Sequence, residues 1–455
     1  MFAFIEKLNL KGFKEKIGNH FSGRYQQYKK LALVLLLLAI FSLGIAGGYL
    51  LFKHQEQNQL LRKDIYVEFI SEVYDSIKNN YWEKITDEQL SQLFKLGAEK
   101  ILSSSQVLEK ENKEGIREMI FRITKNMNKD QKKEFCVNLT NIVLVNLKPF
   151  GRSQLYSQKQ ENQLRETVAN IDKGTDLYKS LGVEKTASQE EINKAYEQKV
   201  AELTPKKETS PEAAQELAEA DRAFVTLSKP ETKLIYDKSG IEPTVFGELA
   251  TPDILHLKMT KLSPQTFDEF QKVVDEIDKA QNPTSLILDL RGNIGGAIDL
   301  LQYFLGPFIG QNQYAYDFFH QGDYQSFKTQ VGWLASLVRY KKMVILVDNQ
   351  TQSSAELMAT VLKKYNVGIL VGTATKGWGT VENTFPLKQQ LDPNEKYSLF
   401  LVHSLTLRDD NQPIEGKGVD PVINIQDNDW QKQLLAYFNY QELVDAVEQI
   451  LKNEN

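Results

Sequence analysis

A serine stands where an apolar run gives way to a helical pattern, in the segment VDNQTQSSAELMA at residues 347–359. A serine at a strand-to-helix junction points its oxygen into the crevice at the edge of the sheet, where the helix dipole favours negative charge. Ser353 is therefore a candidate nucleophile. The alternative is that Ser353 only caps the helix, with Glu356 at the third helical position completing a capping box.

A second segment, LILDLRGNIGG at residues 286–296, joins a buried strand to a glycine turn. Gly295 and Gly296 would expose backbone N–H groups at the carboxyl edge of the sheet, which is where open α/β sheets bind ligands. Taken alone, this segment is better explained as an ordinary strand–turn–helix connection.

The elements that must position these two segments follow from the hydrophobic pattern. Residues 254–259 have the pattern of a strand and residues 263–280 that of a helix. The runs at 285–290 and 343–347 are continuously apolar, which is typical of parallel strands buried on both faces. Strands that alternate with helices predict a layered α/β core over residues 242–455.

Residues 53–170 carry apolar side chains at three- and four-residue spacing, which predicts a bundle of helices. The segment TDEQ, which starts at Thr86, is typical of a helix start with a capping hydroxyl and an acidic first turn. Nothing in this region suggests chemistry.

The segment LALVLLLLAIFSLGIAGGYLLF at residues 31–52 carries no charged residue, and it is long enough to cross a hydrocarbon layer about 30 Å thick. Basic residues outnumber acidic ones in residues 1–30, so the positive-inside rule predicts a cytoplasmic N-terminus and an extracytoplasmic remainder. A cleaved signal peptide is the alternative, but its apolar region is normally shorter. We therefore expect an uncleaved, single-pass anchor in the cell membrane.

Composition excludes several other classes of function. The formal net charge of −5 leaves no basic excess, so we expect no nucleic-acid partner. Cys136 is the one cysteine, which excludes an intramolecular disulfide and a cysteine-based metal cage. No histidine–carboxylate cluster has metal-ligand spacing and no phosphate-binding glycine loop occurs, so we expect neither a metal nor a cofactor. His256 is expected to be a core or edge residue of its strand.

Taken together, residues 65–102 and 250–425 resemble the tail-specific, or C-terminal processing, serine peptidases. In that family a strand ending in Leu-Asp-Leu-Arg and two glycines precedes a serine-rich helix start, a Gly-x-Gly-Thr-Val turn and a closing Gly-x-Gly-Val-x-Pro motif. This chain carries the corresponding residues in the same order: Leu288-Asp-Leu-Arg291, Gly295-Gly296, Ser353-Ser-Ala-Glu356, Val371-Gly372, Thr375, Gly377-Trp-Gly-Thr-Val381 and Ile414-Glu-Gly-Lys-Gly-Val-Asp-Pro421.

The resemblance implies a crotonase-like α/β fold and a serine endopeptidase that cleaves extracytoplasmic proteins or peptides near unstructured C-termini. Position by position, it assigns Ser353 as the acylated nucleophile. It places the oxyanion hole at the N–H of Ser354 and at that of Gly295 or Gly296, since such donors must be fixed before charge develops. The oligomeric state is left open, with a homo-oligomer as one alternative.

Residues 171–241 resemble a small all-α J-domain of the DnaJ type. J-domains engage a heat-shock ATPase through a His-Pro-Asp loop, where this chain has Thr204-Pro-Lys206. Because a lysine reverses the local charge, we predict a J-like structural module without co-chaperone activity. The residues that carry the likeness are Leu181-Gly-Val183, the helix start at Ser188, Ala195-Tyr196, Ala223-Phe224, Leu227-Ser228 and Tyr236-Asp237.

The chain departs from the peptidase family in three ways. The J-like unit occupies the place of the usual PDZ domain, and the helical insert around 103–170 is foreign to the family. The general-base lysine of the family falls on Trp378, whose indole cannot take a proton from a serine hydroxyl. We assign Trp378 to substrate binding instead.

Two residues could replace the missing base. Lys376 lies two positions earlier, on the same face of an extended strand. His403 lies on the expected strand 399–407, and its ordinary pKa of about 6.5 suits a general base. Glu382 and Glu415 could orient it, and Glu415 is also where tricorn-type peptidases carry a catalytic glutamate. Without a base, the chain would be an inactive pseudopeptidase that binds peptides or acts as a scaffold.

Overall fold

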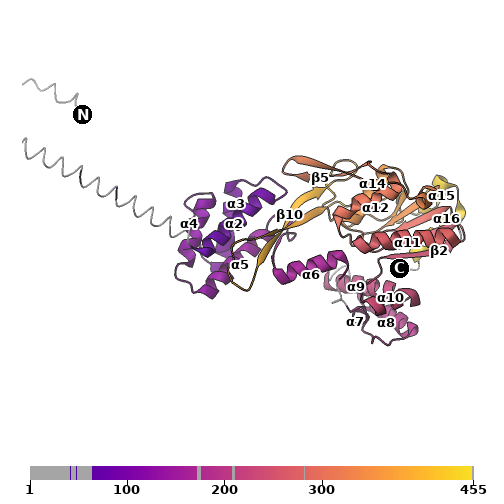
Figure 1. Cartoon of the computed structure of the whole chain (residues 1–455), viewed down its shortest axis with the longest axis horizontal. Coiled ribbons are helices and arrows are strands. Elements are labelled where there is room, and N and C mark those ends of the chain that lie inside the picture. Colours follow the sequence, from indigo (N-terminus) through magenta and orange to yellow (C-terminus); the bar gives the residue numbers. More distant parts are fainter. Residues whose placement is uncertain are drawn as a thin grey trace, which may run out of the picture.

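The computed structural model describes residues 64–171, 176–206, 211–280 and 282–452, together with the single residues 41 and 48. In Figure 1 the described chain is elongated, with a helical bundle at one end, an α/β core at the other and an arm of strands between them. The expected basic segment 1–30 and membrane helix 31–52 lie outside the described residues, apart from those two. Within the described ranges, no helix combines the length and the apolar character that crossing a membrane requires.

The bundle at the N-terminal end consists of helices whose starts are set by side-chain caps. The Asp64 carboxylate accepts the N–H groups at the start of α2, and Thr86 forms a capping box with Gln89 at the predicted start of α3. The apolar faces of the helices meet in one buried cluster, as their spacing predicts. The helices are α2 (Ile65–Asn80), α3 (Asp87–Leu102), α4 (Lys113–Thr124) and α5 (Lys129–Val145).

A five-stranded antiparallel sheet joins the bundle to the core. Its longest strand, β10, pairs with β9, β1 and β5. Leu399 and Leu401 of β10 are fully buried in the apolar cluster of the bundle, and the ring centroids of Tyr397 and Phe69 lie 6.0 Å apart in an edge contact. The strands are β1 (Gln154–Ser157), β5 (Tyr314–His320), β6 (Asp323–Lys328), β9 (Thr380–Pro386) and β10 (Tyr397–Thr406).

The α/β core is built on a six-stranded sheet in the order β11-β8-β7-β4-β3-β2. Its neighbours are parallel except β2, which runs antiparallel to β3 at the edge. The strands are β2 (Val245–Thr251), β3 (Ile254–Met259), β4 (Ser285–Asp289), β7 (Lys342–Val347), β8 (Ile369–Gly372) and β11 (Ile423–Asn424).

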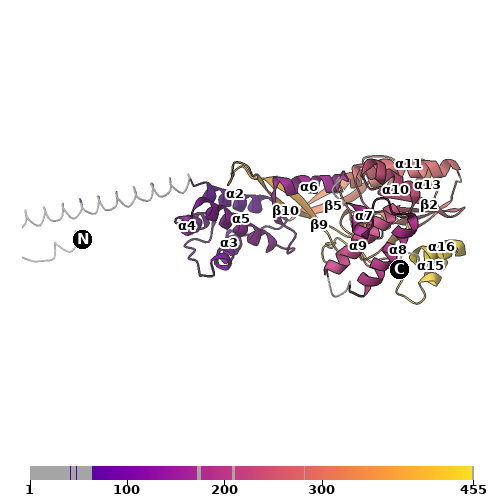
Figure 2. The same ribbon diagram turned by 90° about the horizontal axis from the view of Figure 1, so that it is seen from below.

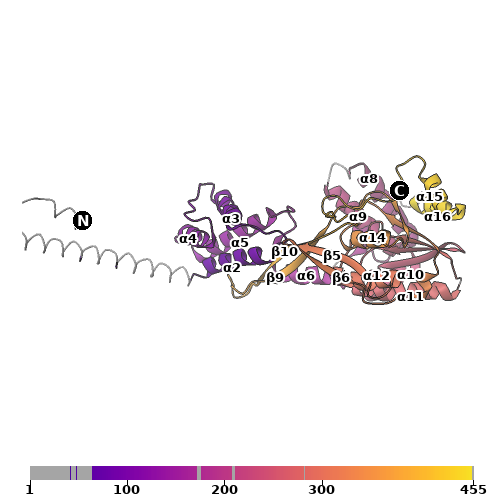
Figure 3. The same cartoon turned by 90° about the horizontal axis from the view of Figure 1, so that it is seen from above.

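Both faces of the central strands are buried, as their continuous apolar runs predict. Alternate residues face α11, α12, α13 and α14 on one side and α15 and α16 on the other. Figure 3 shows α11 and α12 below the sheet and α15 and α16 above it. The predicted α/β core, preceded by an all-α region, is therefore confirmed. The helices are α11 (Pro264–Ala280), α12 (Leu301–Ile309), α13 (Ala335–Val338), α14 (Ser354–Lys364), α15 (Trp430–Phe438) and α16 (Gln441–Lys452).

A small module of helices lies beneath the core in Figure 1 and in front of it in Figure 2. Ser188 caps its second helix in a capping box with Glu191, which is the predicted helix start. Its apolar core includes Tyr178, Ile192 and Ala223. The module contains α7 (Leu177–Leu181), α8 (Gln189–Leu203), the 3₁₀ turn η3 (Thr204–Lys206), α9 (Pro211–Leu227) and α10 (Pro230–Ser239), and α6 (Gln158–Ala169) links it to the arm.

Polar contacts hold this module against the core. Lys229 Nζ lies 2.6 Å from Glu248 on β2, and Arg222 Nε lies 2.6 Å from Glu242 in the linker. The Asn170 amide donates to the Glu242 carbonyl oxygen over 2.9 Å. Because the two ion pairs are partly exposed, each contributes no more than about 1 kcal/mol.

Because Leu399 of β10 is fully buried where the arm meets the bundle, we expect Leu399→Ala to lower the free energy of unfolding by about 2–5 kcal/mol. Leu96 on α3 is exposed, so Leu96→Ala is a matched control that should change it by less than about 0.5 kcal/mol. Denaturant unfolding of the full-length variants measures both. If both substitutions changed the free energy of unfolding equally, the arm and the bundle would not share a core.

Candidate active site

Ser353 lies between the end of β7 and the start of α14, in a backbone conformation that is unusual for a residue with a side chain. Its φ is 58° and its ψ is −129°. Such conformations cost about 1–3 kcal/mol and persist only where surrounding contacts hold them, most often at functional sites. A sharp strand-to-helix turn of this kind is the geometry that exposes a nucleophilic serine above a sheet.

The Glu356 carboxylate holds this turn in place. It is fully buried, and it accepts hydrogen bonds from the Ser353 N–H (2.9 Å), the Thr375 hydroxyl (2.5 Å), the Gly377 N–H (2.7 Å) and the Trp378 N–H (2.8 Å). Burial raises the pKa of Glu356, while these four donors oppose the rise. The hydrogen bond from the Ser353 N–H to Glu356 that a capping box requires is thus present. The same carboxylate also holds the turn at Ser353 against residues 375–378.

Of the two candidate glycines, Gly295 lies directly against Ser353, and Gly296 packs against the backbone of Leu262. At Gly295, where φ is +78°, a Cβ atom would stand 2.7 Å from the Ser353 Cβ. The Gly295 N–H already donates to Asn293 Oδ1 over 2.8 Å. Within the described part of the chain, no acceptor is found for the N–H groups of Gly296 and Ser354. These two N–H groups, rather than that of Gly295, are therefore available to an oxyanion.

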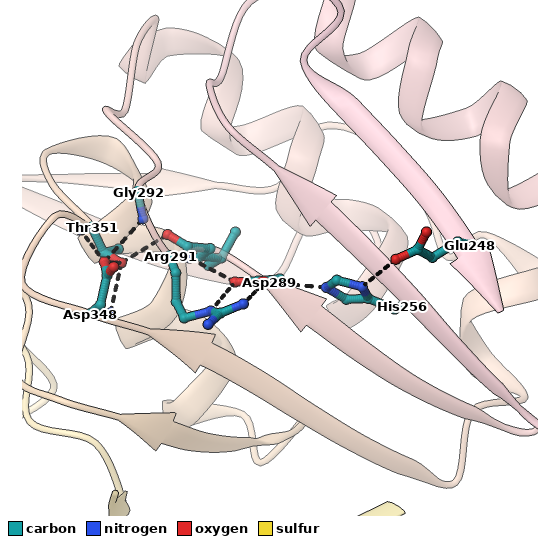
Figure 4. A network of polar contacts seen from close by, with 8 residues as sticks. Glu248, His256, Asp289, Arg291, Gly292, Asp348 and Thr351 are labelled. Carbon is teal, nitrogen blue, oxygen red and sulfur yellow. Dashed lines mark hydrogen bonds and ion pairs between the residues drawn. The ribbon is translucent and has the colours of Figure 1, made fainter. Parts of the chain in front are cut away.

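Side chains join the loop after β4, which contains Gly292, Gly295 and Gly296 (the glycine loop), to the loop between β7 and α14, which contains Ser353 (the nucleophile loop) (Figure 4). Asp348 Oδ1 accepts the Gly292 N–H over 3.0 Å and the Thr351 N–H over 2.8 Å. The Thr351 hydroxyl donates to the Leu290 carbonyl oxygen over 2.8 Å. Both loops are thereby fixed before any substrate arrives.

A row of alternating charges runs behind the glycine loop, from Glu248 through His256 and Asp289 to Arg291 (Figure 4). His256 is buried, with its ring nitrogens 3.4 Å from Glu248 and 3.2 Å from Asp289. Arg291 Nε lies 2.9 Å from Asp289. His256 is thus a partnered core residue, as its strand pattern predicts.

These charges shift one another's pKa values. Burial lowers the pKa of His256, but Asp289 and Glu248 outweigh burial and raise it above its ordinary value. The contact with His256 lowers the pKa of Glu248 to about 2. Burial opposes the ionisation of Asp289, yet Arg291 and His256 hold its pKa well below the usual range.

Lys376 lies on the turn that faces the nucleophile loop. Its N–H donates to the Thr351 carbonyl oxygen over 3.0 Å, and its Nζ lies 5.7 Å from the centroid of the Trp378 ring. Burial and the positive charge of Arg152 lower the pKa of Lys376, while Glu356 opposes the shift. No carboxylate of the described chain forms an ion pair with this ammonium group.

Arg152, which sequence reasoning missed, contacts the same turn. Its Cζ lies 3.4 Å from the centroid of the Trp378 ring, and its Nη2 lies 3.2 Å from Glu415 Oε1. Glu415 Oε2 accepts the Gly379 N–H over 2.8 Å. Arg152 follows α5, in a region whose pattern suggested no chemistry, and no signal in the sequence marks it out.

His403 lies elsewhere, on the arm. Its ring stacks on His320 with centroids 4.2 Å apart, and its Nδ1 lies 2.8 Å from the Ser404 hydroxyl. Burial and the neighbouring His320 lower the pKa of His403. Among the contacts of the described residues, His403 meets neither Ser353 nor the carboxylates that were expected to orient it, because Glu415 binds Arg152 and the Glu382 carboxylate accepts from Thr380.

The arrangement offers a hydroxyl at a rigid turn, two backbone donors beside it and a lysine whose pKa is lowered. These are the parts that acyl transfer requires: a nucleophile, a site for negative charge and a group that can accept a proton.

Comparison with known proteins agrees with this chemistry. Residues 253–425 match the Peptidase family S41 model, and residues 176–237 match the DnaJ domain model. The chain is 29% identical over 195 residues to "Carboxy-terminal processing protease CtpA" of Bacillus subtilis, covering 42% of this chain and 38% of that protein. It is 42% identical over 72 residues to "Chaperone protein DnaJ" of Mycoplasmopsis pulmonis, covering 16% of this chain and 19% of that protein.

The chain thus spans well under half the length of the curated relatives that it matches. It is also similar to the solved structure "Photosystem II D1 C-terminal processing protease", with 12% identity and a TM-score of 0.45 over 80% of this chain and 93% of that one.

The raised pKa of His256 predicts the direction in which the free energy of unfolding changes with pH. A histidine whose pKa is raised by folding stabilises the folded state below its unfolded pKa of about 6.5, and this contribution is lost as pH rises through the folded value. We therefore expect the free energy of unfolding to fall less between pH 6 and pH 8 in His256→Gln than it does in the wild type.

His403→Gln is the matched comparison, because the pKa of His403 is lowered and its effect has the opposite sign. Denaturant unfolding of the full-length proteins at both pH values measures each slope. If the two variants changed the pH dependence in the same direction, the charge assignment in Figure 4 would be wrong.

Proposed function

We propose that this chain, in which residues 253–425 form a domain of peptidase family S41 and residues 176–237 a DnaJ domain, is a serine peptidase with Ser353 as its nucleophile. The observation that carries the proposal is the strained turn at Ser353, held by Glu356 beside two N–H groups without acceptors in the described chain. A merely capping serine would need neither the strain nor the donors.

The proposed reaction begins when Ser353 Oγ attacks the scissile carbonyl carbon while Lys376 accepts the hydroxyl proton. The carbonyl oxygen becomes an oxyanion, which the N–H groups of Gly296 and Ser354 stabilise. The C–N bond then breaks, and the Lys376 ammonium returns its proton to the departing amine. Lys376 then takes a proton from a water molecule that attacks the acyl-enzyme ester. It returns this proton to Ser353 Oγ as the ester C–O bond breaks, and the new carboxylic acid leaves and ionises in solvent.

Lys376 is preferred to His403 as the base for two reasons. The Lys376 backbone is bonded to the nucleophile loop at Thr351, whereas His403 stacks on His320 of the arm. An amine is a better base when its pKa is lowered toward neutrality, and burial and Arg152 act on Lys376 in that direction.

The proposed substrates are proteins or peptides cleaved near unstructured C-termini, in keeping with the carboxy-terminal processing proteases that the chain resembles. Trp378 would present its indole to the bound segment, and the core would be of the crotonase-like kind. The J-like module would act without co-chaperone activity, because a 3₁₀ turn with Lys206 stands in place of the His-Pro-Asp loop.

A second candidate is an inactive pseudopeptidase that binds peptides or serves as a scaffold. The observation in its favour is Trp378, which stands where the family's lysine is expected and is covered by the Arg152 guanidinium. In that case the site would bind a peptide segment without cleaving it.

Labelling with a fluorophosphonate, together with hydrolysis of an unstructured peptide, separates the two candidates. We expect the wild type to be labelled and Ser353→Ala to be inert. Lys376→Ala should lower kcat/KM by about 10²–10⁴-fold, the usual contribution of a general base, and His403→Ala should change it little. An unlabelled wild type would favour the pseudopeptidase, and full activity of Lys376→Ala would remove Lys376 as the base.

We further propose that residues 31–52 anchor the chain in the cell membrane, with residues 1–30 in the cytoplasm and the folded parts outside. The reasons are the uncharged length of the segment and the basic residues before it.

A membrane-impermeant maleimide tests this orientation in intact cells. Cys136 is buried, and burial raises the pKa of its thiol, so it should stay unlabelled in the folded chain. We expect Leu96→Cys, at an exposed position of α3, to react in intact cells and Lys16→Cys to react only after lysis. The reverse pattern, or equal labelling of both, would contradict the orientation.

A further inference from the structure

Arg152 lies outside the S41 domain at residues 253–425, and its backbone is anchored on both sides. The Lys148 carbonyl oxygen accepts the Trp82 indole N–H over 2.7 Å and the Tyr81 hydroxyl over 2.5 Å, both from the end of α2. The neighbouring Ser153 is fully buried, and its hydroxyl accepts the Val402 N–H over 3.1 Å. The bundle and the arm together therefore determine where Arg152 stands.

The Arg152 side chain contacts two residues of the S41 domain, Trp378 and Glu415. Its guanidinium lies over the Trp378 ring and pairs with Glu415, a contact in which both side chains are mostly buried. A guanidinium suits this position because it stacks on an aromatic face while it binds a carboxylate, which an ammonium group does less well. The pairing leaves Glu415 fully engaged, since its other oxygen accepts the Gly379 N–H.

Two other carboxylates of this region are also engaged by other groups. Glu356 of α14 accepts four hydrogen bonds, and Glu382 of β9 accepts the Thr380 hydroxyl over 2.5 Å. The segment that carries Glu415 runs beside the Lys376 turn, with the Gly416 N–H donating to the Gly377 carbonyl oxygen over 2.9 Å. Removal of Arg152 would leave Glu415 as an unpaired carboxylate next to this turn.

We propose that Arg152 is a positioning residue for Lys376. Arg152 pairs with Glu415 and places a second positive charge against the Trp378 indole, which Lys376 also contacts. The Lys376 ammonium therefore has no anionic partner and readily gives up its proton. The lowered pKa of Lys376, to which the Arg152 charge contributes, agrees with this geometry. The inference rests on the proposed function only for what the freed amine then does.

This arrangement makes the bundle part of the catalytic apparatus. A peptidase domain limited to residues 253–425 would lack Arg152, and Glu415 would then be free to pair with Lys376. A paired lysine holds its proton more tightly and is a poorer base. The segment that carries Arg152, which lies outside the residues that match the S41 model, would thus set the protonation state of the base.

The proton affinity of Lys376 can be measured without any turnover. Lysines of the full-length chain, in a Ser353→Ala background, are reductively methylated with ¹³C-formaldehyde, and their NMR signals are titrated. The signal that disappears in Lys376→Arg identifies Lys376. We expect Arg152→Met to raise the proton affinity of Lys376 roughly tenfold, one pKa unit, while Arg152→Lys restores most of the wild-type value.

Lys148→Met, at an exposed lysine of the same segment, is the matched control and should leave the Lys376 titration unchanged. Glu415→Gln is a second variant that should lower the proton affinity of Lys376 or leave it unchanged, because it removes the competing carboxylate. An unmoved Lys376 titration in a folded Arg152→Met variant would overturn the proposal.

Hydrolysis in a Ser353-containing background separates this inference from the proposed function. If Lys376 is the base, the pH–rate profile of Arg152→Met should move to higher pH by the same amount as the NMR titration. A shifted NMR titration with an unshifted pH–rate profile would support the positioning role of Arg152 while overturning Lys376 as the base. An inactive wild type would overturn the proposed function and leave the NMR result standing.

Discussion

The site depends on the carboxylate of Glu356, which is buried at the start of α14 with four hydrogen-bond donors around it. A buried carboxylate is costly unless every lone pair is satisfied, so these donors hold the surrounding backbone to one geometry. One donor is the N–H of Ser353, and the bond offsets the strain of its positive φ. Two others belong to the turn that carries Lys376. A single group therefore sets the nucleophile and the candidate base relative to each other.

The three folded parts are joined in two physically different ways. The bundle and the arm share an apolar cluster in which Leu399 and Leu401 are fully buried, and such burial is worth about 1.5–3 kcal/mol per side chain. The J-like module meets the core through ion pairs such as Lys229–Glu248, which are partly exposed and individually weak. The bundle is thus integral to the site, while the J-like module is attached more loosely to the edge strand β2.

That edge strand also contributes Glu248, the exposed end of the row of charges behind the loop that contains Gly295 and Gly296. Glu248 pairs with Lys229 of the module on one side and with His256 on the other, and His256 contacts Asp289 beneath the loop. Charges in such a row stabilise each other only while each has its partner, because an isolated buried charge is expensive. The J-like module therefore contacts the same electrostatic row that supports the loop containing Gly295 and Gly296.

The sequence by itself determined what depends on local pattern. Continuous apolar runs gave the buried parallel strands, capping residues gave the helix starts at Thr86 and Ser188, and chain position placed Ser353 at a strand-to-helix junction. Only the tertiary structure decided which residues from distant parts of the sequence contact one another. Arg152 reaches Trp378 because the bundle packs against the arm, and His403 meets His320 because β10 pairs with β5. Contacts between distant segments arise from the packing of whole elements, and no spacing of residues along the chain encodes them.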